Sequence, residues 1–356
     1  MPFPNCFIDS FNHYSTSDLF GLGNGMKWGS TGLGSSTGNM FISGGTGLFG
    51  NSLRIVANNT NINVSKVFNN LTTWVIGFRF KLSGLPSTPP QLLSLIDTGT
   101  VQVDLKLNTN GTLFVTRAGT TVTGGTSTNA LATNTWYYVE MMVTINPSIS
   151  ANTWQVNVNG ANWINVAAGQ SSRNTGNSTA NQLALGIWAN GYGTTPTLDY
   201  CDFYCDGGGS VNGGAFWGDT KIECHWPVAV GTYSAWTPVN GLGVGCINDE
   251  TPNGDLNYLS DNTTNDKSTF TFQPLGATPS SIMCVQTVYD VRKNDAGTRQ
   301  VADYCYSGGT GVAGATNNPG NTYLMYTNVL AQDPHTSAAW TASGLNAAEF
   351  GVEEIG

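Results

Sequence analysis

Charged side chains are scarce in this sequence of 356 residues, of which they make up 10%, and its 13 basic residues form no cluster. Proteins that bind nucleic acid or an anionic membrane surface normally carry a dense patch of Lys and Arg. The formal net charge is −9, which opposes contact with either polyanion. The sequence therefore predicts no nucleic-acid partner and no membrane-surface partner.

Long apolar runs are also absent. No stretch approaches the roughly 18 uninterrupted apolar residues that a membrane-spanning helix needs. The first residues, MPFPNCFIDS, have neither the basic start nor the apolar core of a signal peptide. We therefore expect a protein without membrane insertion that is made in a cytosol and is soluble there.

Residues suited to catalysis are few. The chain has three histidines, and residues 1–212 contain a single glutamate, Glu140. Hydrolysis of a glycan normally needs two carboxyl groups that face one substrate. Asp199, Asp202 and Asp206 follow one another along one predicted strand, and side chains alternate between the two faces of a strand. We expect neighbouring acids there to face opposite sides, so the sequence predicts that the protein is not an enzyme.

Apolar and small residues make up much of the chain instead. The hydrophobic fraction is 40%, aromatic residues account for 11%, and 45 residues are glycine. This apolar content is enough to bury a core, which excludes disorder caused by excess charge. The Glu, Lys, Arg and Ala periodicity of a coiled coil or helical bundle is missing. The length suggests two domains, at about 100–200 residues per domain.

Period-two alternation of apolar and polar residues predicts β-strands in the first half. In Thr73–Leu82 the even positions from 74 onward are apolar, and we expect the intervening Arg79 and Lys81 to face solvent. Val101–Leu107 alternates in the same way, and the pairs at 110–111 and 159–160 are Asn-Gly, a strong signal for a two-residue hairpin turn. Short strands at this spacing predict a sandwich of antiparallel sheets. The other strands are expected at residues 113–117, 136–145, 154–158, 163–166, 183–188 and 199–205.

The second half is expected to be a separate, mainly β domain. Residues 1–212 carry eight basic and eight acidic side chains, whereas residues 213–356 carry five basic and fourteen acidic ones. A glycine-rich stretch at 206–214 lies at this change and predicts a linker, so we divide the chain after residue 212. Strands are expected at residues 219–224, 268–273, 282–293, 299–306 and 323–330, a hairpin turn at 294–297, and one short helix at 343–349 with Ser343 as its N-cap.

Short sequence motifs lie near both ends of the first half, and further motifs lie in the second half. The opening motif runs from Phe7 to Tyr14 and continues at Lys27-Trp28, and the closing one runs from Tyr200 to Tyr204. This set resembles the tailed-bacteriophage virion proteins that carry a laminin-G-like, or concanavalin A-like, jelly roll. The resemblance covers nearly the whole chain. Its landmarks in the second half lie at residues 216–219, 236–238, 249–260, 295–299, 334–341 and 345–352.

The resemblance implies an all-β protein, with a concanavalin A-like jelly-roll sandwich at 1–212 and a second, mainly β domain with at most one short helix at 213–356. It also implies a structural protein of the virion surface, assembled in the bacterial host cytoplasm, with major capsid or tail proteins as partners. We expect a homo-oligomer, for which a trimer is one option. A capsid decoration (cement) protein that exposes a lectin-like module is the first expectation. The alternatives are a tail or baseplate adhesin for host surface polysaccharide and, more weakly, a polysaccharide depolymerase.

Aromatic side chains near loops or strand ends are the candidate glycan contacts, because indole and phenol rings stack on sugar rings and keep a polar group at their edge. Trp163, Trp188, Tyr192 and Trp217 are placed in this way. The turn at 190–193 is expected to present Tyr192 outward. Most of the ten tryptophans are expected in the core.

One acidic loop is a candidate calcium site. Asp249, Glu250, Asn253 and Asp255 lie close together in the sequence and offer the oxygen ligands that Ca²⁺ prefers. Turn geometry is the alternative explanation for a loop rich in Asp, Asn and Gly. No cofactor other than calcium is expected.

Overall fold

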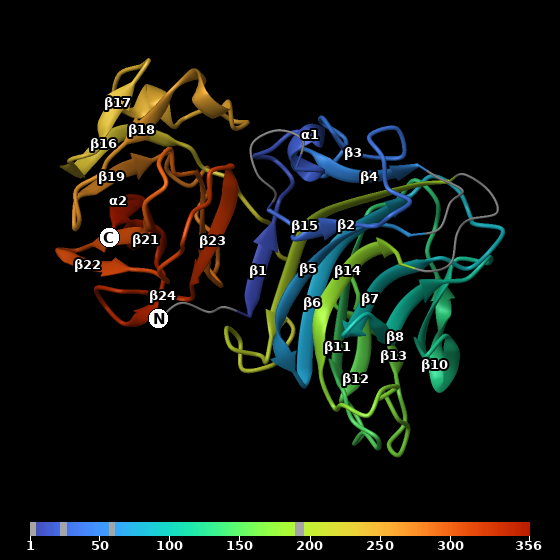
Figure 1. Ribbon diagram of the computed structural model, residues 1–356. Coiled ribbons are helices and arrows are strands. Elements are labelled where there is room, and N and C mark those ends of the chain that lie inside the picture. The colour runs from blue at the N-terminus through green and yellow to red at the C-terminus, as the bar shows by residue number, and fades with distance from the viewer. Residues whose placement is uncertain (1–4, 22–26, 57–60, 189–195) are drawn as a thin grey trace. The chain divides into compact units, whose positions relative to one another are not determined.

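The computed structural model describes residues 5–21, 27–56, 61–188 and 196–356. The chain divides into two compact units, and each consists mainly of β-strands (Figure 1). The all-β fold class expected from the sequence is confirmed. Of the described residues, unit 2 holds 5–12, 28–56, 61–188 and 196–222, and unit 1 holds 13–21, 27 and 223–356.

Unit 2 is a sandwich of two antiparallel sheets, counted within the described residues (Figure 1). The eight-stranded sheet runs in the order β13 (Ala161–Asn165), β12 (Trp154–Val158), β11 (Tyr137–Thr144), β6 (Thr73–Leu82), β15 (Thr197–Gly207), β4 (Ser52–Val56) and β3 (Met40–Ser43), and β1 (Cys6–Asp9) pairs with β15. The seven-stranded sheet runs in the order β10 (Thr120–Ala130), β9 (Thr112–Arg117), β8 (Thr100–Leu107), β7 (Gln91–Asp97), β14 (Ala180–Ile187), β5 (Ile62–Leu71) and β2 (Ser30–Thr31).

Alternation along β6 shows how the two sheets meet. Trp74, Ile76 and Phe78 are fully buried on its inner side. The ring of Trp74 makes an edge contact with Phe68 of the opposite sheet, with centroids 5.4 Å apart. The jelly-roll sandwich expected for the first half is confirmed. The solvent-facing position expected for Arg79 is wrong, because a later segment of unit 2 covers that face and leaves Arg79 buried.

The Asn-Gly pairs end strands as expected, but only one forms a two-residue turn. Asn159 and Gly160 both have positive φ angles, 49° and 77°, which is the type I′ geometry that joins β12 to β13. The loop at Asn110-Gly111 is longer and spans residues 108–111 between β8 and β9. It closes where Gly111 N donates to the carbonyl oxygen of Asn108 at 3.0 Å.

The two motifs that open and close the first half lie side by side in the fold. Strand β1 pairs antiparallel with β15, so that Phe7 lies opposite Cys205 and Asp9 opposite Phe203. Phe7 and Phe203 both pack against Trp28, with ring centroids 5.0 and 5.1 Å from its own. The chain therefore closes this sandwich with residues almost 200 positions apart.

The division between the units lies after residue 222, later than the expected division after residue 212. Residues 213–222 belong to unit 2 because they bond to its eight-stranded sheet. Ile222 N, for example, donates to Asp202 Oδ1 at 2.9 Å. The strand expected at residues 219–224 is wrong, since this stretch has no regular secondary structure. Its polar groups bond to side chains of the sheet instead of a neighbouring strand.

Unit 1 contains a five-stranded sheet and three short two-stranded pairs among its described residues. The sheet runs β16 (Pro227–Ser234), β19 (Lys267–Phe272), β26 (Glu349–Glu354), β21 (Val301–Ser307) and β22 (Thr310–Ala313). The pairs are β17 (Thr237–Val239) with β18 (Tyr258–Ser260), β20 (Val285–Val291) with β23 (Leu324–Leu330), and β24 (Gln332–Asp333) with β25 (Ala338–Ala339). The helical segments are α1 (Thr16–Leu19), α2 (Ala342–Ala347), and the 3₁₀ turns η1 (Gly243–Cys246) and η2 (Gly254–Leu256).

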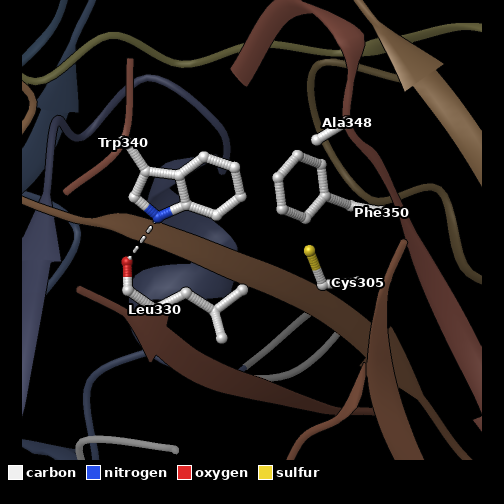
Figure 2. Close-up of a cluster of buried hydrophobic side chains, with 5 residues drawn as sticks. All are labelled: Cys305, Leu330, Trp340, Ala348 and Phe350. Carbon is white, nitrogen blue, oxygen red and sulfur yellow. Dashed lines mark hydrogen bonds between the residues drawn. The ribbon is translucent and has the colours of Figure 1, made fainter. Parts of the chain in front are cut away.

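The core of unit 1 is built around Trp340. Figure 2 shows its indole beside Phe350, with Cys305, Leu330 and Ala348 completing the cluster. The ring centroids of Trp340 and Phe350 are 6.0 Å apart. The buried indole N–H donates to the carbonyl oxygen of Leu330 at 3.0 Å, so the polar group of the tryptophan is satisfied inside the core.

Two local expectations for the second half are wrong. The turn at 294–297 does not join a hairpin, because β20 pairs with β23 and β21 pairs with β22 and β26. The short helix exists, but it begins one residue earlier than expected and its N-cap is Thr341, whose Oγ1 accepts from Gly344 N at 3.0 Å, instead of Ser343. Within the described residues, no helix has the length and apolar character to cross a membrane.

Candidate functional site

Polar side chains gather on the outer face of the eight-stranded sheet. Arg79 and Lys81 lie two residues apart on β6 and therefore share this face. Each has an aspartate partner on the neighbouring strand β15. Arg79 Nε lies 2.9 Å from Asp202 Oδ2, and Lys81 Nζ lies 3.4 Å from Asp199 Oδ2. Asp199 and Asp202 consequently point to the same side of the sheet.

A β-bulge at Asp202 explains why the expected alternation fails. Asp202 has a φ of 48°, and the pairing of β15 with β6 shifts register between Cys201 and Tyr204. One extra residue on one strand reverses the side-chain parity beyond it. The core residues on β15 accordingly change from Tyr200 before the bulge to Phe203 after it. The expectation that neighbouring acids of this strand face opposite sides is therefore wrong.

Four side chains from four strands or their flanks form a partly open row, which we name the exposed row: Trp136, Lys81, Asp199 and Arg54. Lys81 Nζ lies 4.7 Å from the ring centroid of Trp136. Arg54 binds Asp199 through two parallel bonds, Nε to Oδ1 at 2.7 Å and Nη2 to Oδ2 at 3.0 Å. Lys81 and Arg54 keep 23% and 25% of their side-chain surface exposed, and Trp136 is half-buried. The row thus offers solvent an indole ring beside fixed hydrogen-bonding groups.

Five further side chains on the same face are buried, and we name them the covered cluster: Arg79, Tyr138, Glu140, Asp202 and Tyr204. Tyr204 Oη donates to Glu140 Oε1 at 2.7 Å. Burial raises the pKa of Glu140, and the hydrogen bonds from Tyr204 and from Gly218 N oppose that rise. Burial likewise raises the pKa of Asp202, opposed by Ile222 N and Arg79.

Glycine at position 77 makes the contact between Glu140 and Tyr204 possible. Gly77 on β6 lies between them, opposite Glu140 on β11 and opposite Tyr204 on β15. A Cβ atom at position 77 would collide with the ring of Tyr204. Because glycine has no side chain, the ring of Tyr204 can lie over β6. Its hydroxyl then reaches the carboxylate of Glu140 on β11, two strands away from β15.

Residues 208–222, which we name the covering segment, lie over the covered cluster. The indole of Trp217 is parallel to the ring of Tyr204, with centroids 4.2 Å apart and an interplanar angle of 1°. Gly218 N donates to Glu140 Oε1 at 2.9 Å, and Asp219 Oδ1 lies 2.6 Å from Arg79 Nη2. The start of the segment is held by Asp206, which accepts from the backbone N–H groups of residues 211 and 212.

The structure distributes the expected glycan-contact residues over different places. Trp217 belongs to the covering segment and stacks on Tyr204. Trp163 is half-buried on β13 and contacts Tyr137 edge-on, with centroids 6.4 Å apart. Trp188 is half-buried just beyond the end of β14, and Tyr192 lies outside the described residues. The structure does not bring the described three together.

Trp136 was missed by the sequence analysis, although a signal for it was present. It stands at the start of the strand expected at 136–145, two residues before Tyr138 and four before Glu140, so period two places all three on one face. What the sequence did not show is the partner, Lys81, which comes from a strand more than 50 residues earlier.

The expected calcium ligands do not converge on one point. Asn253 Nδ2 donates to Asp249 Oδ2 at 2.7 Å, and Glu250 is exposed. Both oxygens of Asp255 accept from Arg292 Nη2, at 2.8 and 2.9 Å, and the pKa of Asp255 is lowered by this arginine. The described part of the chain contains no group of three or more His, Cys, Asp or Glu side chains suited to a metal. Calcium binding stays a prediction that this arrangement does not favour.

No family model and no curated protein matches the sequence. Among solved structures, alginate lyase Aly36B matches 57% of this chain and 96% of its own at 13% identity with a TM-score of 0.38. The alginate lyase from Corynebacterium sp. matches 48% of this chain and 82% of its own at 11% identity with a TM-score of 0.34. The Trypanosoma rangeli sialidase matches 48% of this chain at 12% identity with a TM-score of 0.30, and the chain spans only 29% of that sialidase.

The expectation that the protein is not an enzyme is corrected. Its physical argument fails, because the bulge at Asp202 gathers acids on one face of the sheet. The matched structures are named as lyases and a sialidase. These comparisons contain nothing that indicates a phage particle.

Proposed function

We propose that unit 2 is a carbohydrate-binding jelly roll that contacts its glycan through the exposed row. The observation that carries this proposal is the half-buried indole of Trp136 next to Lys81 and to the Arg54–Asp199 pair. A sugar ring presents an apolar C–H face and a rim of hydroxyl groups. An aromatic ring suits the first, and charged side chains already held in place suit the second, because little conformational entropy is lost on binding.

The fixed geometry of Asp199 supports this role. Its carboxylate is held by Arg54, by Lys81 and by Ser52 Oγ at 3.3 Å, and its side chain keeps only 3% of its surface exposed. Asp199 therefore orients the two cations and leaves their remaining donors toward solvent. The sheet itself supplies a rigid base, since β6, β15 and β4 are adjacent in it.

Retention of the full chain on immobilised polysaccharides tests the proposal. The panel contains polygalacturonate, alginate and neutral galactan. Trp136→Ala is expected to weaken binding to the retained polysaccharide about tenfold, a loss of about 1.4 kcal/mol. Trp163→Ala is the matched control, because it removes an indole of similar burial from the same sheet and is expected to have no effect. Equal binding by wild type and Trp136→Ala, or a loss confined to Trp163→Ala, contradicts the proposal.

Cleavage of a bound glycan is a second candidate, favoured by the covered cluster. Glu140 is a buried carboxyl with a raised pKa, and it accepts a hydrogen bond from the hydroxyl of Tyr204. Acids and hydroxyls in such an arrangement transfer protons. The same panel is assayed for released reducing ends. Release that is lost in Glu140→Gln supports cleavage, and retention without release leaves binding as the function.

We further propose the surface of a tailed-phage particle as the location, on the sequence motifs alone. As a capsid decoration protein the chain would contact the major capsid protein, and as a tail or baseplate adhesin it would contact host surface polysaccharide. Many copies on a symmetric particle would strengthen weak glycan contacts through multivalency. Mass spectrometry and gel densitometry of purified particles test this proposal by the presence and the copy number of the chain.

A further inference from the structure

Three successive residues of the covering segment present three different groups to the covered cluster. Trp217 places a flat ring on the face of Tyr204, Gly218 donates a hydrogen bond to Glu140, and Asp219 places a carboxylate on Arg79. The first contact is a parallel stack at 4.2 Å, and the other two have lengths of 2.9 and 2.6 Å. A ring, a hydrogen-bond donor and a carboxylate are also the groups of one uronic acid unit.

In the ion pair between Arg79 and Asp219, one side chain is buried and the other is largely exposed. The Arg79 side chain keeps 8% of its surface exposed, whereas the Asp219 side chain keeps 59%. A buried guanidinium needs a carboxylate partner, because unpaired charge in a low-dielectric site is costly. Asp202 provides one such partner from within the sheet. The second partner, Asp219, reaches Arg79 from solvent, so an external carboxylate can replace it without unpairing a second buried charge.

The covering segment is rich in glycine. Its first part contains Gly208, Gly209, Gly213 and Gly214, all with positive φ, and Gly218 also has a positive φ of 84°. Beyond them, the segment contacts the sheet through the side chains of Phe216 and Trp217 and through the ion pair of Asp219 with Arg79. Single hydrogen bonds from Trp217 N to Tyr204 Oη and from Ile222 N to Asp202 Oδ1 add to these contacts. Such a segment opens at lower free energy than the strands beneath it, which are held by continuous ladders.

We infer that the covering segment is an internal occupant of a second sugar subsite, and that this subsite takes an acidic sugar unit with its ring on Tyr204 and its carboxylate on Arg79. The subsite adjoins the exposed row, since Arg79 and Lys81 are two residues apart on β6. The inference rests on the proposed glycan-binding function. It adds the chemical class of the glycan, a polyuronate or another carboxylated polysaccharide, and a segment that competes with it.

Variants of the covering segment test this inference in the full chain. Asp219→Ala removes the internal carboxylate from an exposed position, and the double variant Trp217→Ala/Asp219→Ala also frees the face of Tyr204. Binding of oligogalacturonate and of uncharged oligogalactose is measured by calorimetry. Asp219→Ala is expected to bind oligogalacturonate about threefold more tightly than wild type, and the double variant at least tenfold, with no gain for oligogalactose. Asp295→Ala is the matched control, because it removes a partly exposed aspartate paired with Arg299 in unit 1 and is expected to change neither affinity.

Two results separate the inference from the proposed function. If Trp136→Ala weakens binding but neither covering-segment variant gains affinity for oligogalacturonate, the subsite is overturned and the exposed row stands. If Trp136→Ala has no effect, the proposed function is overturned. Since the double variant loses apolar contacts, near-ultraviolet circular dichroism confirms its fold, and Asp219→Ala alone decides the outcome if the double variant is unfolded. An equal gain for oligogalactose also overturns the acidic class.

Discussion

Asp202 adopts a φ of 48°, a left-handed conformation that is uncommon for residues other than glycine and that Asp tolerates better than most. The conformation is retained because both carboxylate oxygens are engaged, by Arg79 Nε at 2.9 Å and by Ile222 N at 2.9 Å. This one residue moves Tyr204 and Asp206 to the face that already holds Asp199. The chemistry of the outer face thus depends on a single inserted position.

Asp290 on β20 is a second residue whose surroundings decide its behaviour. Its Oδ1 is buried, with no hydrogen-bond partner among the described residues. Burial, and then the nearby carboxylate of Asp18, raise its pKa to about 7, while the backbone N–H of Val291 opposes the rise. Because this pKa lies above its unfolded value of 3.8, the folded state binds more protons than the unfolded state between about pH 4 and pH 7.

Asp290→Asn is therefore expected to stabilise unit 1 at high pH. The stability that protonated Asp290 contributes is fully present below about pH 4 and is lost as pH rises through about 7. The variant removes that loss, so its gain over wild type at pH 8 reaches up to about 4 kcal/mol and disappears at pH 4. Urea unfolding at both pH values measures it. Asp295→Asn, a partly exposed aspartate of the same unit, is the control, and a gain that does not depend on pH contradicts the assignment.

At the scale of elements, the short helix α2 shows how one residue sets a boundary. Thr341 has an extended backbone conformation, and its Oγ1 accepts from Gly344 N, which satisfies one of the free donors of the first turn. Ser343 lies inside the helix, where its hydroxyl is 3.3 Å from that of Thr341. Both residues belong to the types that favour N-caps, so the sequence alone does not choose between them.

Paired substitutions test this assignment. Thr341→Ala is expected to lower the free energy of unfolding of unit 1 by about 1 kcal/mol, because the N-cap hydrogen bond is lost. Ser343→Ala is expected to change it little or to stabilise slightly, since alanine favours helix interiors. Urea unfolding of the two variants in parallel gives the difference. The reverse order of effects means that Ser343 is the N-cap.

At the scale of the whole molecule, the two units differ in core and in charge. Unit 2 has eight basic and eight acidic residues, whereas unit 1 has five basic and fourteen acidic ones. Each has its own buried cluster, that of unit 1 being centred on Trp340 and Phe350. Separate cores favour separate unfolding transitions, and the repulsion among the acids of unit 1 is reduced by salt.

Differential scanning calorimetry is therefore expected to resolve two transitions. Trp340→Ala is expected to destabilise unit 1 by about 3–5 kcal/mol, because it leaves a cavity beside Phe350 and removes the donor to Leu330. The midpoint temperature of the unit 2 transition is expected to stay unchanged. Added salt is expected to raise the midpoint temperature of the unit 1 transition only. Equal displacement of both transitions indicates that the chain unfolds as one cooperative body.

Local patterns in the sequence determined much of unit 2. The alternation in Thr73–Leu82 placed a strand correctly because one face of it meets the core, and Asn159-Gly160 gave a turn because both residues tolerate positive φ. The all-β class follows from many such segments. In unit 1 the strands expected at 268–273, 282–293, 299–306 and 323–330 lie near β19, β20, β21 and β23, whereas β16 and β26 were not predicted. The partners of the strands were not found either, because alternation does not say which strand lies alongside.

Only the tertiary structure decided the candidate site. The exposed row joins Arg54, Lys81, Trp136 and Asp199, and the covered cluster receives its cover from residues 208–222, so each contact spans many residues of sequence. The sequence by itself determined that these strands are half-apolar and antiparallel, because hydrophobic period and turn chemistry are local. One bulge and a distant segment that packs over the sheet decided which polar side chains share a face. Register and long-range packing depend on the whole folded unit, so local patterns do not determine them.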